Sequence, residues 1–264
     1  MSCHLWSDLT APELEELAGD TAVALLPVGA IEQHGPHLPL STDATLAEGM
    51  ALAAAERVQA ATVLVLPTVA VGKSDEHRGF PGVLSLDGAT LQAVLMQIGR
   101  SVARSGLRRL VFLNAHGGNV PVLQQAIRAL RIEEGLFCVS AGWMSMGFPE
   151  GLLSAQEMRD DIHAGLIETA AMLHFRPDLV KMALARDFVP ASRAVAEGNS
   201  VLRLLGPVSA GWMMRDLNAD GAAGNAAAAT AETGRQIVEH AAARYATLLE
   251  EVARHPIPFQ AGRA

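Results

Sequence analysis

Short apolar runs alternate along the chain with longer stretches in which apolar and polar residues mix at helical spacing. The apolar runs are as continuous as expected for strands covered on both faces, and they span residues 22–29, 62–67, 108–114 and 136–143. The stretches between them predict helices at residues 44–59, 87–104 and 120–134. This alternation predicts a parallel sheet with right-handed crossovers.

The pattern loosens after residue 144. Residues 163–175 are expected to be helical, residues 186–223 to be loop with one short strand, and residues 224–253 to form a long Ala-rich helix. No repeat or linker interrupts the chain. The predicted fold is therefore α/β, one domain over residues 1–264 with a mainly parallel sheet flanked by helices.

Composition and charge narrow the class of protein. Half of the 264 residues are hydrophobic, which allows a sizeable core, and the formal net charge of -8 argues against nucleic acid or an anionic membrane as partner. Cys3 and Cys138 are too few for a disulfide framework, and neither a signal peptide nor a membrane span is found in the sequence. A cytoplasmic location is expected.

Polar residues with catalytic potential follow three of the predicted strands. They are Glu32, His34 and Asp43 after the first strand, Ser74, Glu76 and His77 after the second, and His116 after the third. In an open parallel sheet the carboxyl ends of the strands face one crevice, where ligands bind. The sequence therefore predicts a site at this edge.

The first of these loops, PVGAIEQHGPHLPLSTD, has the composition of a metal site. In an extended segment, Glu32 and His34 point to the same side. Imidazole with carboxylate suits Zn, Mn or Fe better than Ca or Mg, and the two oxygens of Asp43 could bridge two ions. The alternative is a polar loop in which Asp43 only caps the following helix.

Two further stretches, NAHGGN and HAGLIET, extend this set. The glycines after His116 would also suit a phosphate loop, but the chain has neither GxGxxG nor GxxxxGK[ST], so a metal ligand is favoured. His163 is expected to project from a loop, and Glu168 to reach a metal from one turn inside a helix. The alternative places Glu168 on an exposed helix face, although a Glu before the apolar residues AAMLHF would need a partner if buried.

Taken in order, PVGAIEQHGPHLPLSTD, FPGVLSLDG, NAHGGN and HAGLIETA resemble the creatininase (creatinine amidohydrolase) family from about residue 20 to about residue 180. The resemblance implies a single α/β domain with two divalent metal ions per chain, hydrolysis of amide or amide-like C–N bonds, and usually a homohexamer. By position, it implies metal ligands at Glu32, His34, Asp43 and His116, with Asp43 as the bridge. It also implies that His163 acts near the substrate and that Ser74 and Trp143 lie on the substrate side.

The chain departs from creatininase at three positions. Gly117 and Gly118 stand where creatininase has a tyrosine and a metal-ligating glutamate, and Arg159 stands where it has a pocket tryptophan. Glu168 is the expected substitute ligand. The glycines are expected to widen the pocket floor and Arg159 to bind an anionic group, which disfavours creatinine. The sequence HGGN at this motif, in place of the creatininase sequence, is shared by family relatives that act on other amides. Among them are a deformylase of formamidopyrimidine compounds and a peptidase of mycofactocin maturation.

The predicted function is a metal-dependent amidohydrolase that cleaves a C–N bond of a small cyclic amide or formamide by metal-activated water. His163 would pass a proton to the leaving nitrogen, oriented by Asp160 or Asp161. Ser74 lacks a GxSxG context, so direct attack by water is preferred. Two alternatives stay open: hydrolysis of another bond, either the C–C bond of a cyclic diketone or a short peptide, and an inactive metal-binding oligomer.

Overall fold

The computed structural model describes residues 3–257 and is built on a five-stranded parallel sheet. The strand order is β1-β3-β2-β4-β5, and neighbours pair in parallel throughout. The strands are β1 (Cys3–Leu5), β2 (Val23–Val28), β3 (Val63–Val65), β4 (Arg109–Asn114) and β5 (Phe137–Gly142). The central strands β2 and β4 are buried along their whole length, which explains their unbroken apolar sequences.

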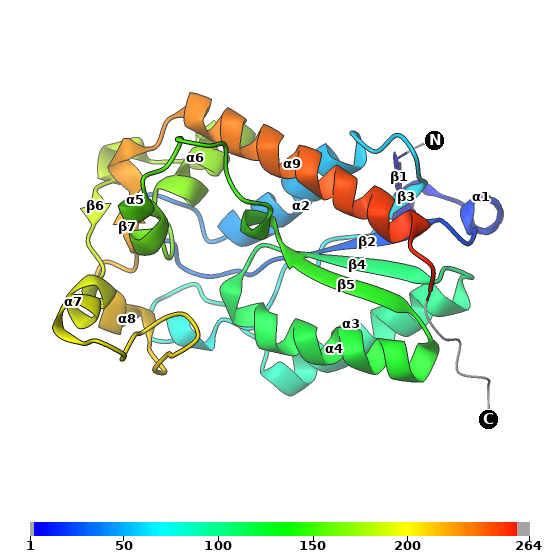
Figure 1. Cartoon of the computed structure of the whole chain (residues 1–264), viewed down its shortest axis with the longest axis horizontal. Helices are drawn as coiled ribbons and strands as arrows, with labels where there is room; N and C mark the ends of the chain where they lie inside the picture. The colour runs from blue at the N-terminus through cyan, green and yellow to red at the C-terminus, as the bar shows by residue number, and fades with distance from the viewer. Residues whose placement is uncertain (1–2, 258–264) are drawn as a thin grey trace.

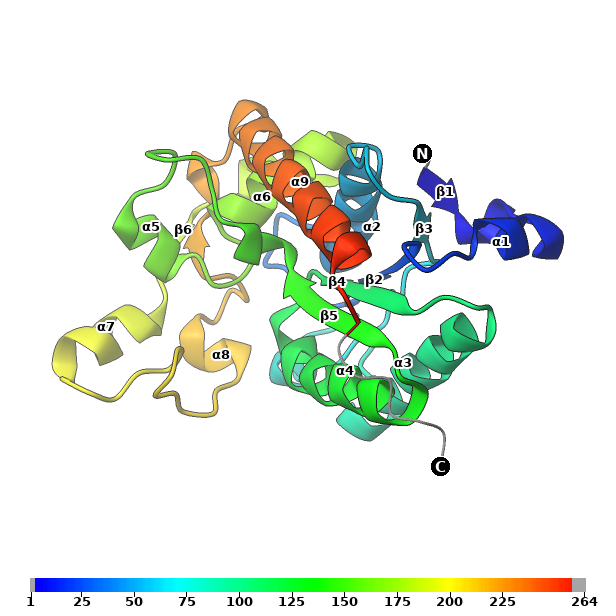
Figure 2. The ribbon, with the colours of Figure 1, turned by 45° about the vertical axis from the view of Figure 1, so that its right-hand side comes forward.

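Helices cover both faces of the sheet (Figures 1 and 2). On one face lie α2 (Thr42–Ala55), α6 (Leu166–Phe175) and α9 (Ala231–Arg254), and on the other lie α3 (Gly88–Arg104) and α4 (Val120–Glu134). Each face has its own apolar core, the larger under α2, α6 and α9. The predicted α/β class with a mainly parallel sheet is confirmed.

Near the amino terminus, the structure contains two elements that the apolar pattern did not predict. They are the edge strand β1 and helix α1 (Ala11–Leu17). The helix begins with a capping box in which Thr10 and Glu13 exchange hydrogen bonds. Both elements lie at the side of the sheet away from β5.

The loosely patterned segment after residue 144 forms short elements at one end of the sheet (Figure 1). They are α5 (Ala155–Asp160), β6 (Asp187–Phe188), α7 (Ala191–Gly198), α8 (Met214–Leu217) and β7 (Gly224–Asn225). The expectation of loop with one strand over residues 186–223 is therefore wrong where α7 and α8 form. Their small size explains the weak periodicity of their sequences.

Two predicted helices begin later than expected. The helix expected from residue 163 begins at Leu166, because His163 exchanges backbone hydrogen bonds with Ala223 and Ala164 has a φ of 52°. The helix expected from residue 224 begins at Ala231, because β7 occupies its first residues and Thr230 caps the helix. The later start of α6 leaves His163 outside the helix, as its predicted role requires.

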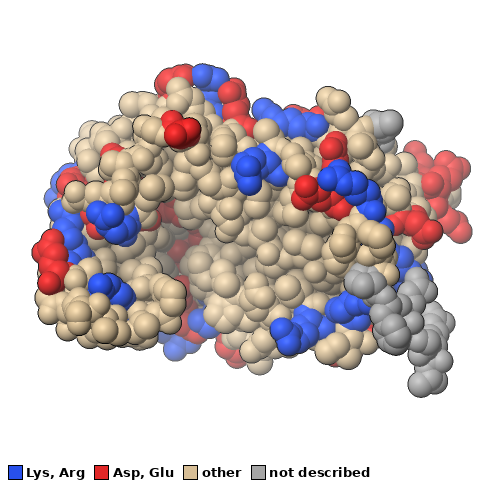
Figure 3. Space-filling model, viewed as in Figure 1, with Lys and Arg blue, Asp and Glu red and all other residues tan. Residues whose placement is uncertain are grey.

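The distribution of charge on the surface (Figure 3) agrees with the negative net charge of the sequence. On the face shown in Figure 3, Lys and Arg side chains are scattered among acidic ones and form no single basic patch. Within residues 3–257 no helix is long and apolar enough to cross a membrane, and Cys3 and Cys138 are both free thiols.

Candidate active site

Three loops meet at the carboxyl edge of the sheet, and Asn119 ties them together. Its side chain accepts a hydrogen bond from the Lys73 N–H (2.9 Å), after β3, and donates to the Gly29 carbonyl (2.9 Å), after β2. It also donates to the side chain of Asn114 at the end of β4 (3.2 Å). One buried amide therefore fixes the relative positions of the loops that carry the polar residues.

Six predicted site residues converge there into one buried group, which we call the cluster. Its members are Glu32, His34, Asp43, His116, His163 and Glu168. None is more than 7 % exposed. The first four come from the loops at the sheet edge and the start of α2, and the last two come from the segment that leads into α6.

Asp43 lies between two imidazoles. Its Oδ1 is 3.1 Å from His34 Nε2, and its Oδ2 is 3.1 Å from His116 Nδ1. Helix α2 begins at Thr42 with Ser41 as its N-cap, so the alternative in which Asp43 caps the helix is wrong. Each carboxylate oxygen faces a different imidazole nitrogen, which is the arrangement a bridging carboxylate needs.

Glu32 and Glu168 flank this pair on opposite sides. Glu168 Oε2 is 3.9 Å from His34 Nε2 and accepts the Ala164 N–H at 2.6 Å. Glu32 Oε2 is 3.3 Å from His116 Nε2, and Glu32 Oε1 is 3.6 Å from His163 Nδ1. The alternative that places Glu168 on an exposed helix face is wrong.

Several carboxylate oxygens of the cluster are buried without a hydrogen bond. Both oxygens of Glu32 and Oδ2 of Asp43 have no hydrogen-bond partner among residues 3–257, although imidazole nitrogens lie 3.1–3.6 Å away. Donor atoms that share one ion at about 2.1 Å lie roughly 3.4 Å apart in tetrahedral geometry. Unpaired oxygens at such separations fit cations between them, so the residues present suit divalent metals.

The electrostatics of the cluster agree with this fit. Burial raises the pKa of Glu32 to about 8 and that of Glu168 to about 7. Burial alone would lower the pKa of the histidines, but the carboxylates around them raise it to about 9 for His34 and about 10 for His116. Without ions, protons have to neutralise these carboxylates. A divalent cation can take the place of those protons.

Backbone carbonyls select which nitrogen of each histidine is free. His34 Nδ1 lies 3.1 Å from the Glu32 carbonyl, and His163 Nε2 lies 2.8 Å from the Gln33 carbonyl. His116 Nε2 lies 2.9 Å from the Lys73 carbonyl. A carbonyl only accepts, so each of these nitrogens donates, and the neutral rings offer their other nitrogen to the cluster.

The space beside Gly118 is filled, contrary to the expected wider pocket floor. A Cβ at Gly118 would clash with Glu76 Oε1, His116 Nε2 and the Lys73 carbonyl, whereas one at Gly117 would meet nothing within 4 Å. Glu76 Oε1 lies 3.5 Å from His116 Nε2. The carboxylate that takes the place of a side chain at 118 therefore comes from Glu76, while Glu168 approaches His34 on the other side.

The three predicted substrate-binding residues lie in different surroundings. Ser74 is fully buried, and its N–H donates to Ser85 Oγ (2.9 Å). Trp143 is 1 % exposed in the larger core, where its indole N–H has no acceptor among the described residues. Burial dominates the raised pKa of Glu32, and the nearby Ser74 side chain is among the groups that lower it, so Ser74 lies beside the cluster. Ser74 and Trp143 both remain predictions as substrate contacts.

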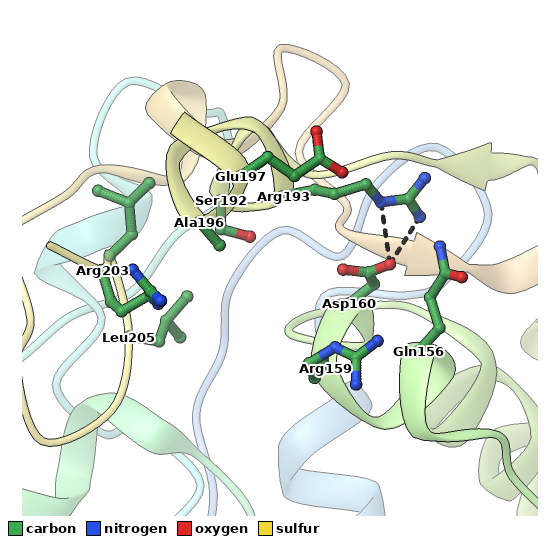
Figure 4. A pocket seen from close by; sticks show the side chains of 10 residues that line it. Gln156, Arg159, Asp160, Ser192, Arg193, Ala196, Glu197, Arg203 and Leu205 are labelled. Carbon is green, nitrogen blue, oxygen red and sulfur yellow. Dashed lines mark hydrogen bonds and ion pairs between the residues drawn. The ribbon is translucent and has the colours of Figure 1, made fainter. Parts of the chain in front are cut away.

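Arg159 lies away from the cluster, in a cavity of about 440 Å³ between α5, α7 and the loop at Arg203 (Figure 4). Arg193 also lines it but is paired with Asp160 (2.6 Å). No cluster residue lines this cavity. Its size and its arginines suit an extended anionic group.

The expectation that Asp160 or Asp161 orients His163 is wrong. Asp160 pairs with Arg193, and Asp161 accepts the Ile167 N–H (3.2 Å) at the start of α6. The Gln33 carbonyl is the group that holds the His163 ring.

Sequence reasoning placed Glu76 and His77 at this edge without assigning either a specific role, and it missed Gln33 next to the cluster. His77 Nε2 is 3.1 Å from Glu32 Oε1, and Gln33 hydrogen-bonds His77. The available signal was the position of Glu76 and His77 after the second strand, at the edge where the other site residues meet.

The family model described as creatinine amidohydrolase matches residues 7–249. The chain belongs to the creatininase family. It is 39 % identical over 175 residues to a mycofactocin precursor peptide peptidase of Mycolicibacterium smegmatis, and this match covers 65 % of each chain. It is 37 % identical over 206 residues to a creatinine amidohydrolase of Pseudomonas putida, which covers 70 % of this chain and 76 % of the other.

Solved structures of the family share the fold. A Bacteroides fragilis protein described as a putative creatinine amidohydrolase superposes with a TM-score of 0.81 at 30 % identity, covering 98 % of this chain and 100 % of the other. Creatininases described with Mn and as a Zn-Zn type superpose with TM-scores of 0.77 and 0.75. The recognition of the family from its ordered motifs is confirmed.

The contrast between Gly117 and Gly118 is testable. Gly118→Ala should lower the free energy of unfolding by about 1–3 kcal/mol, because its Cβ would clash with backbone and with His116. Gly117→Ala is the matched control and should change it by no more than about 0.5 kcal/mol. Denaturant titration measures both, and equal effects would contradict the crowding at Gly118.

Proposed function

We propose that this chain hydrolyses an amide C–N bond with water activated by two divalent ions held in the cluster. The observation that carries the proposal is Asp43, whose two oxygens face His34 and His116 among buried carboxylate oxygens without hydrogen bonds. The proposed ligands are Glu32, His34, Asp43, His116 and Glu168, and the proposed ions are zinc, manganese or iron. When bound, such ions lower the pKa of a water toward neutrality and polarise the substrate carbonyl.

His163 is the proposed proton carrier. Its Nε2–H is engaged by the Gln33 carbonyl, so Nδ1 is bare and faces the cluster. Burial lowers the pKa of His163, which keeps the ring neutral and able to accept a proton from the attacking water at Nδ1. The same nitrogen can then donate that proton to the leaving nitrogen.

The substrate class follows from the surroundings of the cluster. A small cyclic amide or formamide is proposed first, with creatinine disfavoured because Arg159 stands at the position of an aromatic side chain in creatininase and lines a separate cavity that suits a larger, anionic substrate. A short peptide is the second candidate, and two observations favour it: the identity to mycofactocin precursor peptide peptidases, and a cavity of about 440 Å³ that contains arginines. The homohexamer, the cytoplasmic location and the single domain over residues 1–264 stay predictions.

The metal count tests the proposal directly. Protein purified without chelator should hold two divalent ions per chain by elemental analysis, and Asp43→Asn should lose both while keeping its circular dichroism spectrum. Asp75→Asn is the matched control, because Asp75 pairs with Lys73 and Arg78 outside the cluster. Full activity after complete chelation, or two ions retained in Asp43→Asn, would refute the bridging role.

The role of His163 is separable from that of a ligand. His163→Ala should lower kcat by roughly 10²–10⁴-fold and leave the metal content unchanged, because proton transfer is lost and the ligands remain. The loss should be smallest for amides with good leaving groups. Loss of an ion from this variant would instead make His163 a ligand.

Arg159 tests the substrate class. In a panel of formamides, cyclic amides and short peptides with and without an anionic group, the anionic members should be preferred and creatinine should be cleaved negligibly. Arg159→Ala should raise KM for the best substrate more than it lowers kcat. This result is expected when a contact is lost that stabilises the bound substrate and the transition state equally. Arg176, paired with Asp178 on the surface, provides the control variant Arg176→Ala. Efficient creatinine turnover that Arg159→Ala leaves unchanged would contradict this assignment.

A further inference from the structure

Gln33 has a side chain whose orientation is fixed at both ends. It lies between Glu32 and His34 in the sequence and is 6 % exposed. Its Oε1 accepts the Gly35 N–H at 3.0 Å, and its Nε2 lies 2.8 Å from His77 Nδ1. A backbone N–H can only donate, so the amide oxygen must face Gly35 and the NH₂ group must face His77.

This orientation determines the tautomer of His77. Because Nδ1 accepts a hydrogen bond from the Gln33 amide, it cannot carry a hydrogen, and the neutral ring has its hydrogen on Nε2. That nitrogen lies 3.1 Å from Glu32 Oε1. His77 is 2 % exposed, so its N–H has no access to bulk water.

Distance alone would count His77 among the metal ligands. Ligand atoms of Glu32, His77 and His163 all lie within 4.8 Å of one another. A protonated nitrogen has no lone pair to give to a metal, so the tautomer excludes His77 from that role. The three histidines of the cluster differ, because each donates to a backbone carbonyl through one nitrogen, so that in the neutral ring the nitrogen facing the cluster has the lone pair.

The Gln33 amide is enclosed by two turns that only glycine suits. Gly35 has a φ of 63° and supplies the N–H that fixes the amide oxygen. Gly221 has a φ of 78°, and a Cβ there would clash with Gln33 Oε1. The enclosure holds the amide in place, and the Gly35 N–H fixes its sense, because a reversed amide would set its NH₂ group against that donor.

We propose that Gln33 and His77 form a positioning pair that holds the Glu32 carboxylate by directing the polar His77 Nε2–H at Glu32 Oε1, a 3.1 Å electrostatic contact outside hydrogen-bond geometry. The pair keeps His77 out of the metal shell, places the positive end of the N–H dipole against Glu32 Oε1 and leaves Glu32 Oε2 for a cation. The metal-dependent part of this inference rests on the proposed function, whereas the tautomer rests only on Gly35 and Gln33. His77 is a positioning residue because it acts through Glu32.

Nuclear magnetic resonance of the imidazole nitrogens tests the tautomer. The full chain, labelled with ¹⁵N in histidine, is measured with zinc and without metal, and the His77 signals are assigned by their loss in His77→Gln. In both states His77 should be the neutral ring with hydrogen on Nε2 and a bare Nδ1. Hydrogen on Nδ1, or an Nε2 bound to zinc, would overturn the proposal. Absence of zinc binding would refute the proposed function and leave the tautomer measurable.

Paired variants test the positioning role by the zinc dissociation constant. Gln33→Glu faces His77 with an oxygen, so the hydrogen should move to Nδ1, and one zinc should bind about 10–100-fold more weakly. Gln125→Glu, the same charge change on the exposed surface of α4, is the control and should have no effect. His77→Phe should weaken zinc similarly, while His77→Gln keeps a donor and should stay within a few-fold of the natural chain. Equal losses in both His77 variants would show a packing role only and overturn the proposal.

Discussion

The structure depends on the burial of carboxylates that protein groups alone do not satisfy. Glu32, Asp43 and Glu168 are all removed from water, and three of their oxygens accept no hydrogen bond from the described residues. Burying an unpaired charge costs several kcal/mol per ion. Imidazoles with a raised pKa and carboxyls that hold a proton reduce this cost in the metal-free chain. Such a centre is costly for a fold to keep unless cations bind it.

The parallel sheet makes this concentration of charge possible. Its strands end at one edge, and the loops after β2, β3 and β4 meet there. Asn119 binds to all three, so the separations within the cluster are set by one buried side chain as well as by the strands. The last two members, His163 and Glu168, are held by backbone pairing with Ala223 and by the start of α6.

Most of this architecture could be predicted from the sequence, because its signals are local. Continuous apolar runs revealed β2 to β5, and the order of strands and loops revealed which residues would meet. Helices α1 and α5 are too short for a periodic pattern, although the capping boxes at Thr10 and Ser154 were readable. The hydrogen bond from Gln33 to His77 spans 44 positions, and no local pattern reports on such a contact.

Position 118 shows why a motif does not by itself define a metal centre. Gly118 stands where creatininase is expected to have a ligand, which suggested either Glu168 as a substitute or an inactive site. In the fold, the space next to it is occupied by Glu76 from another loop, and the hydrogen bond from His116 to the Lys73 carbonyl runs where a side chain would stand. In this chain the additional carboxylate near His116 therefore comes from Glu76, on a different loop from position 118. Carboxylates can reach a site from any loop at the same sheet edge, so the absence of one motif residue has to be judged against all of those loops.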